Sequence, residues 1–226
     1  MSVAPVVVIG MHRSGTSCLA GCLQDLGLNL GEVNTAAPHN KKGNREDPRL
    51  WVVHDAVLSR VGAAWDRPPT EPVAWTVEEK AALKAVLAEY EAVPRPWGFK
   101  DPRATVLLDG WLEVLPELRL TASIRHPLAV AGSLAARNGF SLEQSLVIWA
   151  AYNRAVLGWH SRMPVTVVDY DAPDYEARVR AMAAALGLLS ERPMPFREGE
   201  LNHQAVTSPP PPEATALWDA LRAAAR

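Results

Sequence analysis

Cysteine is scarce in this sequence, because only two of its 226 residues are cysteines, Cys18 and Cys22. On a helix these two would lie on one face, four residues apart, where small apolar side chains pack inward. The sequence places no further metal-ligating residues around them that would complete a site. We expect two reduced thiols in the core of a cytoplasmic protein, and no bound metal.

An excess of charge and a long apolar run are also missing. The 23 basic and 25 acidic residues give a net charge of −2, which argues against nucleic acid or an anionic membrane as a general partner. No apolar run approaches the roughly 20 residues that cross a bilayer, and the first residues do not read as a signal peptide. With 48% hydrophobic residues, residues 1–226 are predicted to form a single domain in the cytoplasm.

Short apolar stretches alternate with helical patterns along most of the chain. Buried strands are predicted at residues 6–9, 97–99, 118–124 and 164–168. Helices are predicted at residues 18–28, 50–61, 76–90, 104–115, 127–137, 142–159, 175–186 and 214–226, and residues 188–212 are predicted to be irregular. Strands that alternate with helices form a parallel sheet covered on both faces. The sequence thus predicts an α/β fold, a three-layer sandwich like that of the P-loop NTPases.

Single residues mark where several of these helices begin and end. Thr76 and Glu79 have the spacing of a capping box, which predicts the start of a helix at that point. Pro127 is suited to the first position of the helix that follows the third strand. Gly187 is expected to end the helix at residues 175–186.

The first predicted strand leads into a segment, Gly10–Ser17, that is suited to bind an anion. A strand, a glycine turn and a helix N-terminus direct several backbone N–H groups at one point, which suits a phosphate. A turn that serves only close packing remains an alternative, but such a turn has no need of a cation. The donors predicted to bind the phosphate are Arg13, Ser14, Gly15, Thr16 and Ser17.

The same segment lacks one expected residue. Its frame, Gly10-x4-Gly15-x-Ser17, has the spacing of a Walker A loop, yet Thr16 stands where the Walker lysine would be. The loop therefore lacks the cation that NTPases place on the terminal phosphates. We expect it to hold a phosphate or a phosphosulfate.

A second group of donors follows the third strand. Arg125 ends that strand, and Ser133 and Arg137 lie four residues apart on one face of the next helix. Two guanidinium groups and a hydroxyl form a good receptor for a second phosphate, although a surface arginine pair beside a helix serine is the alternative. The carboxyl ends of parallel strands meet at one edge of a sheet, so this group should lie near the loop and near Lys100–Arg103.

These motifs resemble, in their order along the chain, the sulfotransferases that depend on 3′-phosphoadenosine 5′-phosphosulfate (PAPS), in particular the bacterial and Golgi-type branches. Gly10–Ser17 resembles the 5′-phosphosulfate loop of that family, and Ser123–Ser133 resembles its 3′-phosphate motif. Trp97–Arg103 is similar to a Lys-Asp-Pro motif of the family, and Val167–Asp171 to its Tyr-Glu strand end, with an aspartate in place of the glutamate.

The resemblance implies an enzyme that moves a sulfuryl group from PAPS, as co-substrate, to a hydroxyl or amine of a small-molecule or carbohydrate acceptor. The transfer is an in-line displacement that needs no metal, and PAPS has no transferable γ-phosphoryl group, which fits the missing Walker lysine. Its 3′-phosphate would account for the second group of donors, Arg125, Ser133 and Arg137, for which a simple nucleotide hydrolase has no use.

Such a displacement requires a base for the acceptor proton and a cation near the leaving oxygen. The resemblance implies Lys100 as the cation and Glu46 as the base, because Asn40–Asp47 is similar to the bacterial pattern Asn-x-Lys-Gly-x-x-Glu. His12 stands close to the predicted sulfate position and could hydrogen-bond it. The alternatives for the base are His12, His39, His54, His126 and Asp47.

Residues outside these motifs suggest how the acceptor and the nucleotide are covered. Trp51, Trp65 and Trp75 could stack on a sugar or aromatic acceptor, or belong to the core. Arg45 could bind an acidic acceptor or be a solvated charge. By their position in the resemblance, Asn202 and His203 are expected to cover the adenine and the 3′-phosphate.

Two other functions are compatible with a phosphate loop on this fold. A P-loop kinase of small metabolites would need Mg²⁺ and a lysine from elsewhere, which Lys41, Lys42 or Lys100 could supply. A non-catalytic nucleotide-binding protein would bind the nucleotide and transfer nothing. The presence of Glu46, Lys100 and Arg125 together favours the enzyme.

Overall fold

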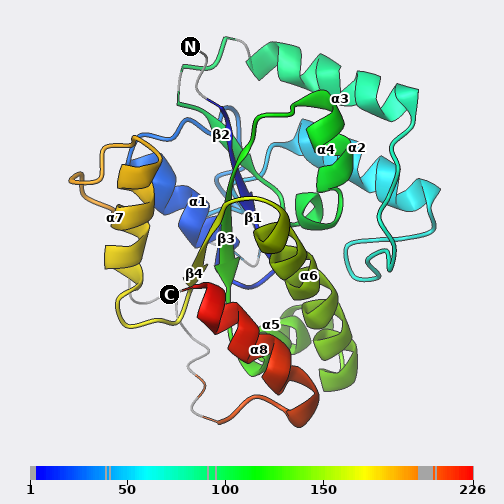
Figure 1. Cartoon of the computed structure of the whole chain (residues 1–226), viewed down its shortest axis with the longest axis vertical. Helices are drawn as coiled ribbons and strands as arrows, with labels where there is room; N and C mark the ends of the chain where they lie inside the picture. The colour runs from blue at the N-terminus through cyan, green and yellow to red at the C-terminus, as the bar shows by residue number, and fades with distance from the viewer. Residues whose placement is uncertain are drawn as a thin grey trace.

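The computed structural model describes residues 4–38, 40, 42–90, 92–94, 96–197, 206 and 208–225. Its centre is a sheet of four parallel strands in the order β2-β1-β3-β4, shown in Figure 1. The strands are β1 (Val6–Ile9), β2 (Gly98–Lys100), β3 (Arg119–Ile124) and β4 (Val165–Asp169). The predicted α/β fold with a parallel sheet is confirmed, and all four predicted strands are present within a few residues of their expected bounds.

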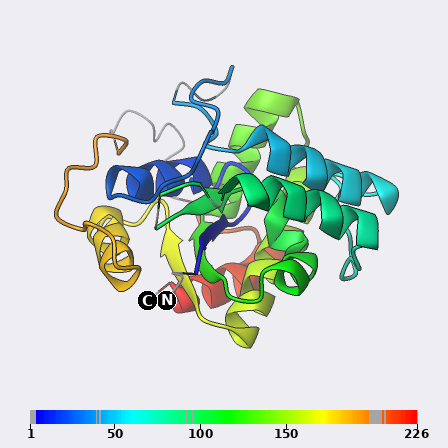
Figure 2. The same ribbon diagram turned by 90° about the horizontal axis from the view of Figure 1, so that it is seen from above.

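Helices cover both faces of this sheet (Figures 1 and 2). One face packs its even-numbered β1 residues, Val6 and Val8, against α1 and α7. The other face packs Val7 and Ile9 into a larger core with the remaining helices. The helices are α1 (Thr16–Asp25), α2 (Pro48–Arg60), α3 (Val77–Tyr90), the 3₁₀ helix η1 (Pro102–Val106), α4 (Leu108–Val114), α5 (Pro127–Asn138), α6 (Leu142–Arg162), α7 (Tyr175–Ala185) and α8 (Pro212–Ala224).

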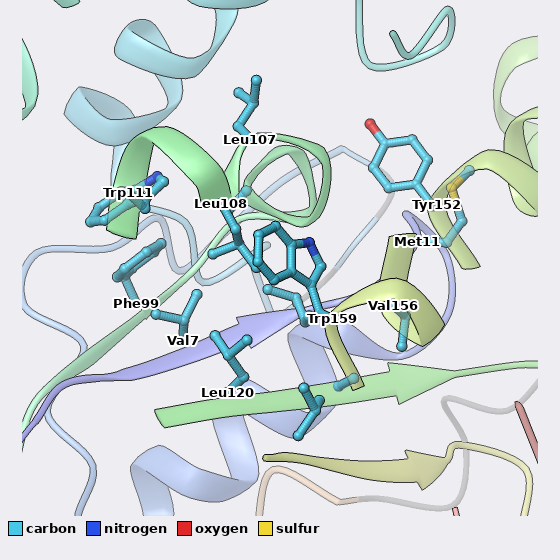
Figure 3. Close-up of a cluster of buried hydrophobic side chains, with 14 of the residues drawn as sticks. Val7, Met11, Phe99, Leu107, Leu108, Trp111, Leu120, Tyr152, Val156 and Trp159 are labelled. Atoms are coloured by element: carbon cyan, nitrogen blue, oxygen red, sulfur yellow. The ribbon is translucent and has the colours of Figure 1, made fainter. Parts of the chain in front are cut away.

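The larger core is rich in aromatic side chains (Figure 3). Val7 of β1 pairs in register with Phe99 of β2 and Leu120 of β3, and the Phe99 ring stacks on Trp111 with centroids 4.2 Å apart. Trp159 of α6 donates from its indole to the Thr105 carbonyl at 3.0 Å, which ties α6 to η1. Because β1 is apolar on both sides, its end, where the segment Gly10–Ser17 begins, is held from both faces of the sheet.

The expected helix signals are present. The Thr76 backbone N–H donates to the Glu79 carboxylate at 2.8 Å, and the Glu79 N–H donates to the Thr76 hydroxyl at 3.2 Å, which confirms the capping box. Pro127 is the first residue of α5, and Gly187 follows α7 with a φ of 73°. These helices therefore begin and end where local side-chain chemistry places the boundary.

Two predicted helices differ from the observed ones. The stretch predicted as one helix at 104–115 is instead η1 followed by α4, with Leu107 between them at φ −126°. The Asp101 carboxylate accepts from the Arg103 N–H at 2.9 Å, so this segment begins at the end of β2 and not at residue 104. Helix α1 begins two residues earlier than expected and ends at Asp25, before Gly27 with its φ of 102°.

Both cysteines lie in α1, free and buried, with their sulfur atoms 4.0 Å apart. This agrees with the expectation of reduced core thiols. Among the helices of the described residues, we find none with the length and apolar composition that crossing a membrane requires.

Candidate functional site

The segment from Gly10 to Ser17 adopts a backbone path that few residues tolerate. Gly10 has a φ of +129°, and a Cβ there would lie 2.4 Å from the Ser123 carbonyl oxygen. Gly15 has a φ of +81°, and a Cβ there would lie 2.1 Å from the Tyr170 ring. Arg13 adopts a φ of 66° although it is not a glycine. Non-glycine residues in this region store strain, which occurs most often at ligand sites.

Neighbouring elements hold this loop from both sides. Thr105 of η1 accepts a hydrogen bond from the Gly10 N–H at 2.9 Å, and Ser123 of β3 donates from its hydroxyl to the Ser14 carbonyl at 2.6 Å. The Ser14 hydroxyl itself is buried without a hydrogen-bond partner in the described structure. Since the first N–H groups of a helix have no partner within it, the start of α1 adds further donors. The loop is therefore a rigid set of donors.

Arginine side chains from two elements surround the loop. The Arg13 Nε atom donates to the Ser133 hydroxyl of α5 at 2.7 Å. Arg125 pairs with Asp171 at 3.0 Å and lies over the Tyr170 ring at 4.8 Å. Burial and the nearby Arg137 and Arg125 charges lower the pKa of Arg13. Cations gathered in this way repel one another, so an anion bound among them would stabilise the arrangement.

A cavity of about 170 Å³ opens next to this loop. The cavity brings together residues from the loop Gly10–Ser17, from the segment before α2, from the end of β2 and from α5. The lining residues are His12, Arg13, Thr16, Ser17, Asn44, Glu46, Trp51, Trp65, Lys100, Pro102, Arg103 and Arg137. The three predicted catalytic residues, Glu46, Lys100 and His12, thus share one cavity with four of the eight predicted phosphate donors, namely Arg13, Thr16, Ser17 and Arg137.

The carboxylate and the ammonium predicted for catalysis are in direct contact. The Lys100 Nζ atom donates to Glu46 Oε1 at 2.5 Å, and it lies 3.5 Å from the Ser17 hydroxyl at the start of α1. Both side chains are buried, and Arg103 places a second cation 3.9 Å from Glu46 Oε2. The Glu46 carboxylate is therefore flanked by two cationic side chains, and the ammonium of Lys100 stands between this carboxylate and the loop Gly10–Ser17.

His12 lies on the wall of the cavity between two aromatic rings. Its ring is 4.7 Å from Trp65 and 5.8 Å from Tyr152, measured between centroids. Burial, with Arg103 and Lys100 as further causes, holds the pKa of His12 well below its usual value of 6.5. Its Nε2 atom is buried and has no hydrogen-bond partner in the described part of the chain. The imidazole is thus neutral near pH 7, with one ring nitrogen left for a ligand.

The other described histidines have structural partners. His54 lies in the core, where its Nδ1 is 2.8 Å from Asp101 Oδ2 and the Trp111 indole donates to its Nε2 at 2.7 Å. Since Nε2 accepts, the proton of His54 is on Nδ1 and both ring nitrogens are engaged. His126 accepts from the Leu128 N–H at 3.3 Å as the N-cap of α5. His39 lies outside the described residues.

Asp47, the carboxylate beside Glu46, caps α2. It accepts from the Arg49 N–H at 2.9 Å and from the Tyr90 hydroxyl at 2.7 Å, and it thereby joins α2 to α3. Among the carboxylates considered for the base, Glu46 is the one that lines the cavity.

Arg103 is a site residue to which the sequence reasoning gave no role. Its guanidinium is buried, pairs with Asp101 at 3.2 Å and with Asp55 at 2.6 Å, and forms part of the cavity wall. The signal in the sequence was the run Lys100–Arg103 at the end of a strand. The sequence did not predict the 3₁₀ turn of η1, and this turn places the side chain of Arg103 in the cavity wall.

The acceptor residues proposed from the sequence separate into two groups. Trp51 and Trp65 line the cavity, whereas Trp75 is 5% exposed and packs against Gly110 in the core. The Arg45 guanidinium lies over the Phe196 ring at 4.8 Å. Lys41, Asn202 and His203 lie outside the described residues, so their predicted roles stay predictions.

No protein-family model matches this sequence, and no curated protein matches it by sequence. Among solved structures, the chain is similar to the sulfotransferase domain of the Synechococcus PCC 7002 olefin synthase (17% identity, 81% of this chain and 73% of that chain, TM-score 0.47). It is also similar to the sulfotransferase STF9 from Mycobacterium avium (17% identity, 82% of this chain and 69% of that chain, TM-score 0.48). A third similar structure is the sulfotransferase domain from the curacin biosynthetic pathway (13% identity, 95% of this chain and 83% of that chain, TM-score 0.43). All three of these solved structures are described as sulfotransferases or sulfotransferase domains.

Proposed function

We propose that this chain is a sulfotransferase that moves a sulfuryl group from PAPS to a hydroxyl or amine of a small-molecule or carbohydrate acceptor. The observation that carries this proposal is the contact between Lys100 and Glu46 in a cavity beside the phosphate loop. A base and a cation stand next to a predicted anion site, which is what an in-line transfer from an anionic donor requires.

The residues present fit PAPS as the co-substrate. The strained loop, the buried Ser14 hydroxyl without a partner and the Arg13 guanidinium suit an anionic group at the start of α1. Arg13, Ser14, Gly15, Thr16 and Ser17 would hold the 5′-phosphosulfate. Arg125 and Ser133 would hold the 3′-phosphate, for which the sequence also predicted Arg137. When bound, PAPS supplies the sulfuryl group that is transferred.

The side chains of the cavity would divide the proton and charge chemistry among them. Glu46 would take the proton of the acceptor at its carboxylate, because it is the carboxylate that faces the cavity. Lys100 is the hydrogen-bond partner of the buried Glu46 carboxylate, and its ammonium lies 3.5 Å from the Ser17 hydroxyl, toward the loop Gly10–Ser17. His12 would offer its Nε2 as a hydrogen-bond partner. The aromatic rings around His12 exclude water from this wall of the cavity.

Calorimetric titration with adenosine 3′,5′-bisphosphate, the product of the proposed reaction, tests this function. We expect micromolar affinity that does not change when Mg²⁺ is added or removed. ATP with and without Mg²⁺ serves as the comparison. Tight binding of the bisphosphate, combined with no transfer to any acceptor, would instead indicate a non-catalytic nucleotide-binding protein.

A P-loop kinase is the second candidate, and one observation favours it. Lys100 approaches the start of α1 from β2, so an ammonium is present near the loop although Thr16 replaces the Walker lysine. A kinase would bind ATP with Mg²⁺ more tightly than it binds the bisphosphate. That order of affinities in the titration would replace the sulfotransferase proposal.

A further inference from the structure

Arg137 differs from the other cations of the cavity in having no polar partner among the described residues. Lys100 pairs with Glu46, the guanidinium of Arg103 is held by carboxylates, and Arg13 donates to Ser133. Within the described ranges, the contact recorded for the Arg137 side chain is with the Trp65 ring, 5.5 Å from the guanidinium carbon to the ring centroid. A half-buried guanidinium without an anion beside it is a candidate ligand group.

Arg137 lies in the wall of the cavity that the acceptor must enter. It lines the same cavity as Glu46 and Lys100, whereas Arg125, the residue predicted to bind the 3′-phosphate, does not appear in that lining. The acceptor must reach Glu46 for its proton to be removed. A cation in the wall near Glu46 can therefore contact the acceptor directly.

The mouth of the cavity has flat apolar surfaces next to these cations. Trp65 stacks on Phe140 with ring planes 23° apart and carries Arg137 on its ring. Trp51 is 40% exposed and carries Arg103, 5.7 Å from its ring centroid. Flat indole faces bind the faces of aromatic and sugar rings. Phe140 and Arg137 both lie against the Trp65 ring, whereas Trp51 keeps exposed indole surface beside Arg103.

The size of the cavity also bears on the acceptor. Its volume of about 170 Å³ is well below the roughly 300–1,000 Å³ of pockets that enclose a ligand of drug size. Only the reacting end of an acceptor larger than one ring would enter it, and the remainder would rest on the aromatic mouth. Groups attached to that ring would then meet Arg137.

We propose that Arg137 binds an acid group of the acceptor, and that the acceptor is therefore a ring compound with a carboxylate or similar acid, its ring placed against the exposed indole of Trp51. This inference rests on the proposed sulfotransferase function. It assigns Arg137 to acceptor selection and leaves the 3′-phosphate to Arg125 and Ser133, which differs from the role expected for Arg137 from the sequence. A planar guanidinium that stacks on an indole keeps its edge donors free for a bidentate bond to a carboxylate.

Binding to the protein saturated with adenosine 3′,5′-bisphosphate tests the inference. The probes are two pairs of hydroxyl compounds that differ in one acid group: 4-hydroxyphenylacetate against 4-hydroxyphenethyl alcohol, and methyl glucuronide against methyl glucoside. We expect the acid of one pair to bind about tenfold or more tightly than its neutral partner, as for a charge-assisted hydrogen bond. The pair that shows the preference identifies an aromatic or a sugar acceptor.

Variants then assign the preference to Arg137. Arg137→Gln should abolish the preference for the acid and leave bisphosphate affinity within about threefold, which also shows that the variant is folded. Arg137→Lys should retain part of the preference because it keeps the charge. Arg154→Gln, which removes an exposed arginine of α6, is the matched control and should behave as the unchanged protein.

Each outcome bears on either the inference or the proposed function. Loss of bisphosphate affinity by more than tenfold in Arg137→Gln would return Arg137 to the nucleotide site and overturn the inference. Equal binding of acid and neutral compounds in both pairs would overturn it as well. If the unchanged protein does not bind the bisphosphate, the proposed function itself fails, and the inference fails with it.

Discussion

Two buried groups of polar side chains contain neighbouring residues of the chain, Lys100 and Asp101, but differ in how completely they are hydrogen-bonded. Lys100 belongs to the cavity group, which consists of Lys100, Glu46 and His12. Asp101 belongs to the core group, which consists of Asp101, His54 and Trp111. Successive side chains of a strand point to opposite faces, so the end of β2 directs one residue to each group.

The core group is fully hydrogen-bonded. Each ring nitrogen of His54 has a partner, and Asp101 accepts from His54 on one oxygen and from Arg103 on the other. Burial raises the pKa of Asp101, but His54 and Arg103 outweigh burial, and the pKa lies far below its usual value. A buried polar network with every partner present fixes the packing around it.

The cavity group is not complete. The Nε2 atom of His12 has no partner among the described residues, and the same is true of the nearby Ser14 hydroxyl. An unpaired polar atom in a protein interior costs free energy unless a ligand or water satisfies it. Both groups are buried and charged, so neither property separates them. What separates them is the number of polar atoms left without a hydrogen-bond partner: the cavity group, expected to take part in catalysis, has such atoms, and the core group, expected to stabilise the fold, has all of its partners among the described residues.

The largest expected effect is on turnover. Glu46→Gln removes the proposed base but keeps an oxygen that can accept from Lys100, so turnover should fall about 10²–10⁴-fold. Bisphosphate affinity should change by less than about threefold. Release of the bisphosphate from PAPS, with the tightest-binding probe as acceptor, measures turnover, and Glu113→Gln on the surface is the control. Turnover close to that of the unchanged protein would move the base to another residue, first of all His12.

The next effect is on stability and concerns the core group. Asp101→Asn places an amide donor against either the His54 N–H or Arg103, so it breaks a buried pair and should cost about 3 kcal/mol of unfolding free energy. Urea denaturation measures this difference. Asp109→Asn, which breaks an exposed pair with Arg162, should cost well under about 1 kcal/mol. Similar costs for the two variants would show that the saturated core group contributes no more to stability than an exposed ion pair does.

Arg125 is intermediate between the two groups, because it has a carboxylate partner in the protein and is still expected to bind a ligand. Arg125 pairs with Asp171 and is also predicted to bind the 3′-phosphate. Arg125→Ala should weaken adenosine 3′,5′-bisphosphate about 10- to 100-fold, as expected for charged hydrogen bonds, and leave AMP nearly unchanged. Calorimetry compares the two nucleotides, with Arg162→Ala as control. An equal loss for both nucleotides would refute a specific role at the 3′-phosphate.

The smallest effect is the pH dependence of stability due to His12. Because its pKa in the folded protein is lowered, the unfolded chain binds a proton that the folded chain does not as the pH falls below 6.5. The contribution of His12 is therefore complete above pH 6.5 and is lost on acidification, by at most about 1.4 kcal/mol per pH unit. Urea denaturation at pH 7.5 and 5.5 should show a smaller loss in His12→Gln. Parallel losses in both proteins would contradict a buried, neutral His12.

Much of the site could be predicted because its residues are consecutive in the chain. The loop from Gly10 to Ser17 combines a strand, a glycine turn and a helix start, and local backbone geometry alone brings its donors together. The capping box at Thr76 was predictable for the same reason. The position of Arg103 was not, because the 3₁₀ turn depends on Asp101 and on packing against α6.

By itself, the sequence determined the parallel α/β fold, the strand–turn–helix geometry of the loop Gly10–Ser17 and the proximity of Lys100 to that loop. These depend on apolar periodicity, on glycine at positive φ and on the rule that parallel strands end at one edge. Only the tertiary structure decided that Glu46 contacts Lys100, that His54 is a core residue and that Arg137 lies beside Trp65 at the cavity. Such contacts join side chains that are distant in the chain, and their partners are fixed by how the helices pack on the sheet.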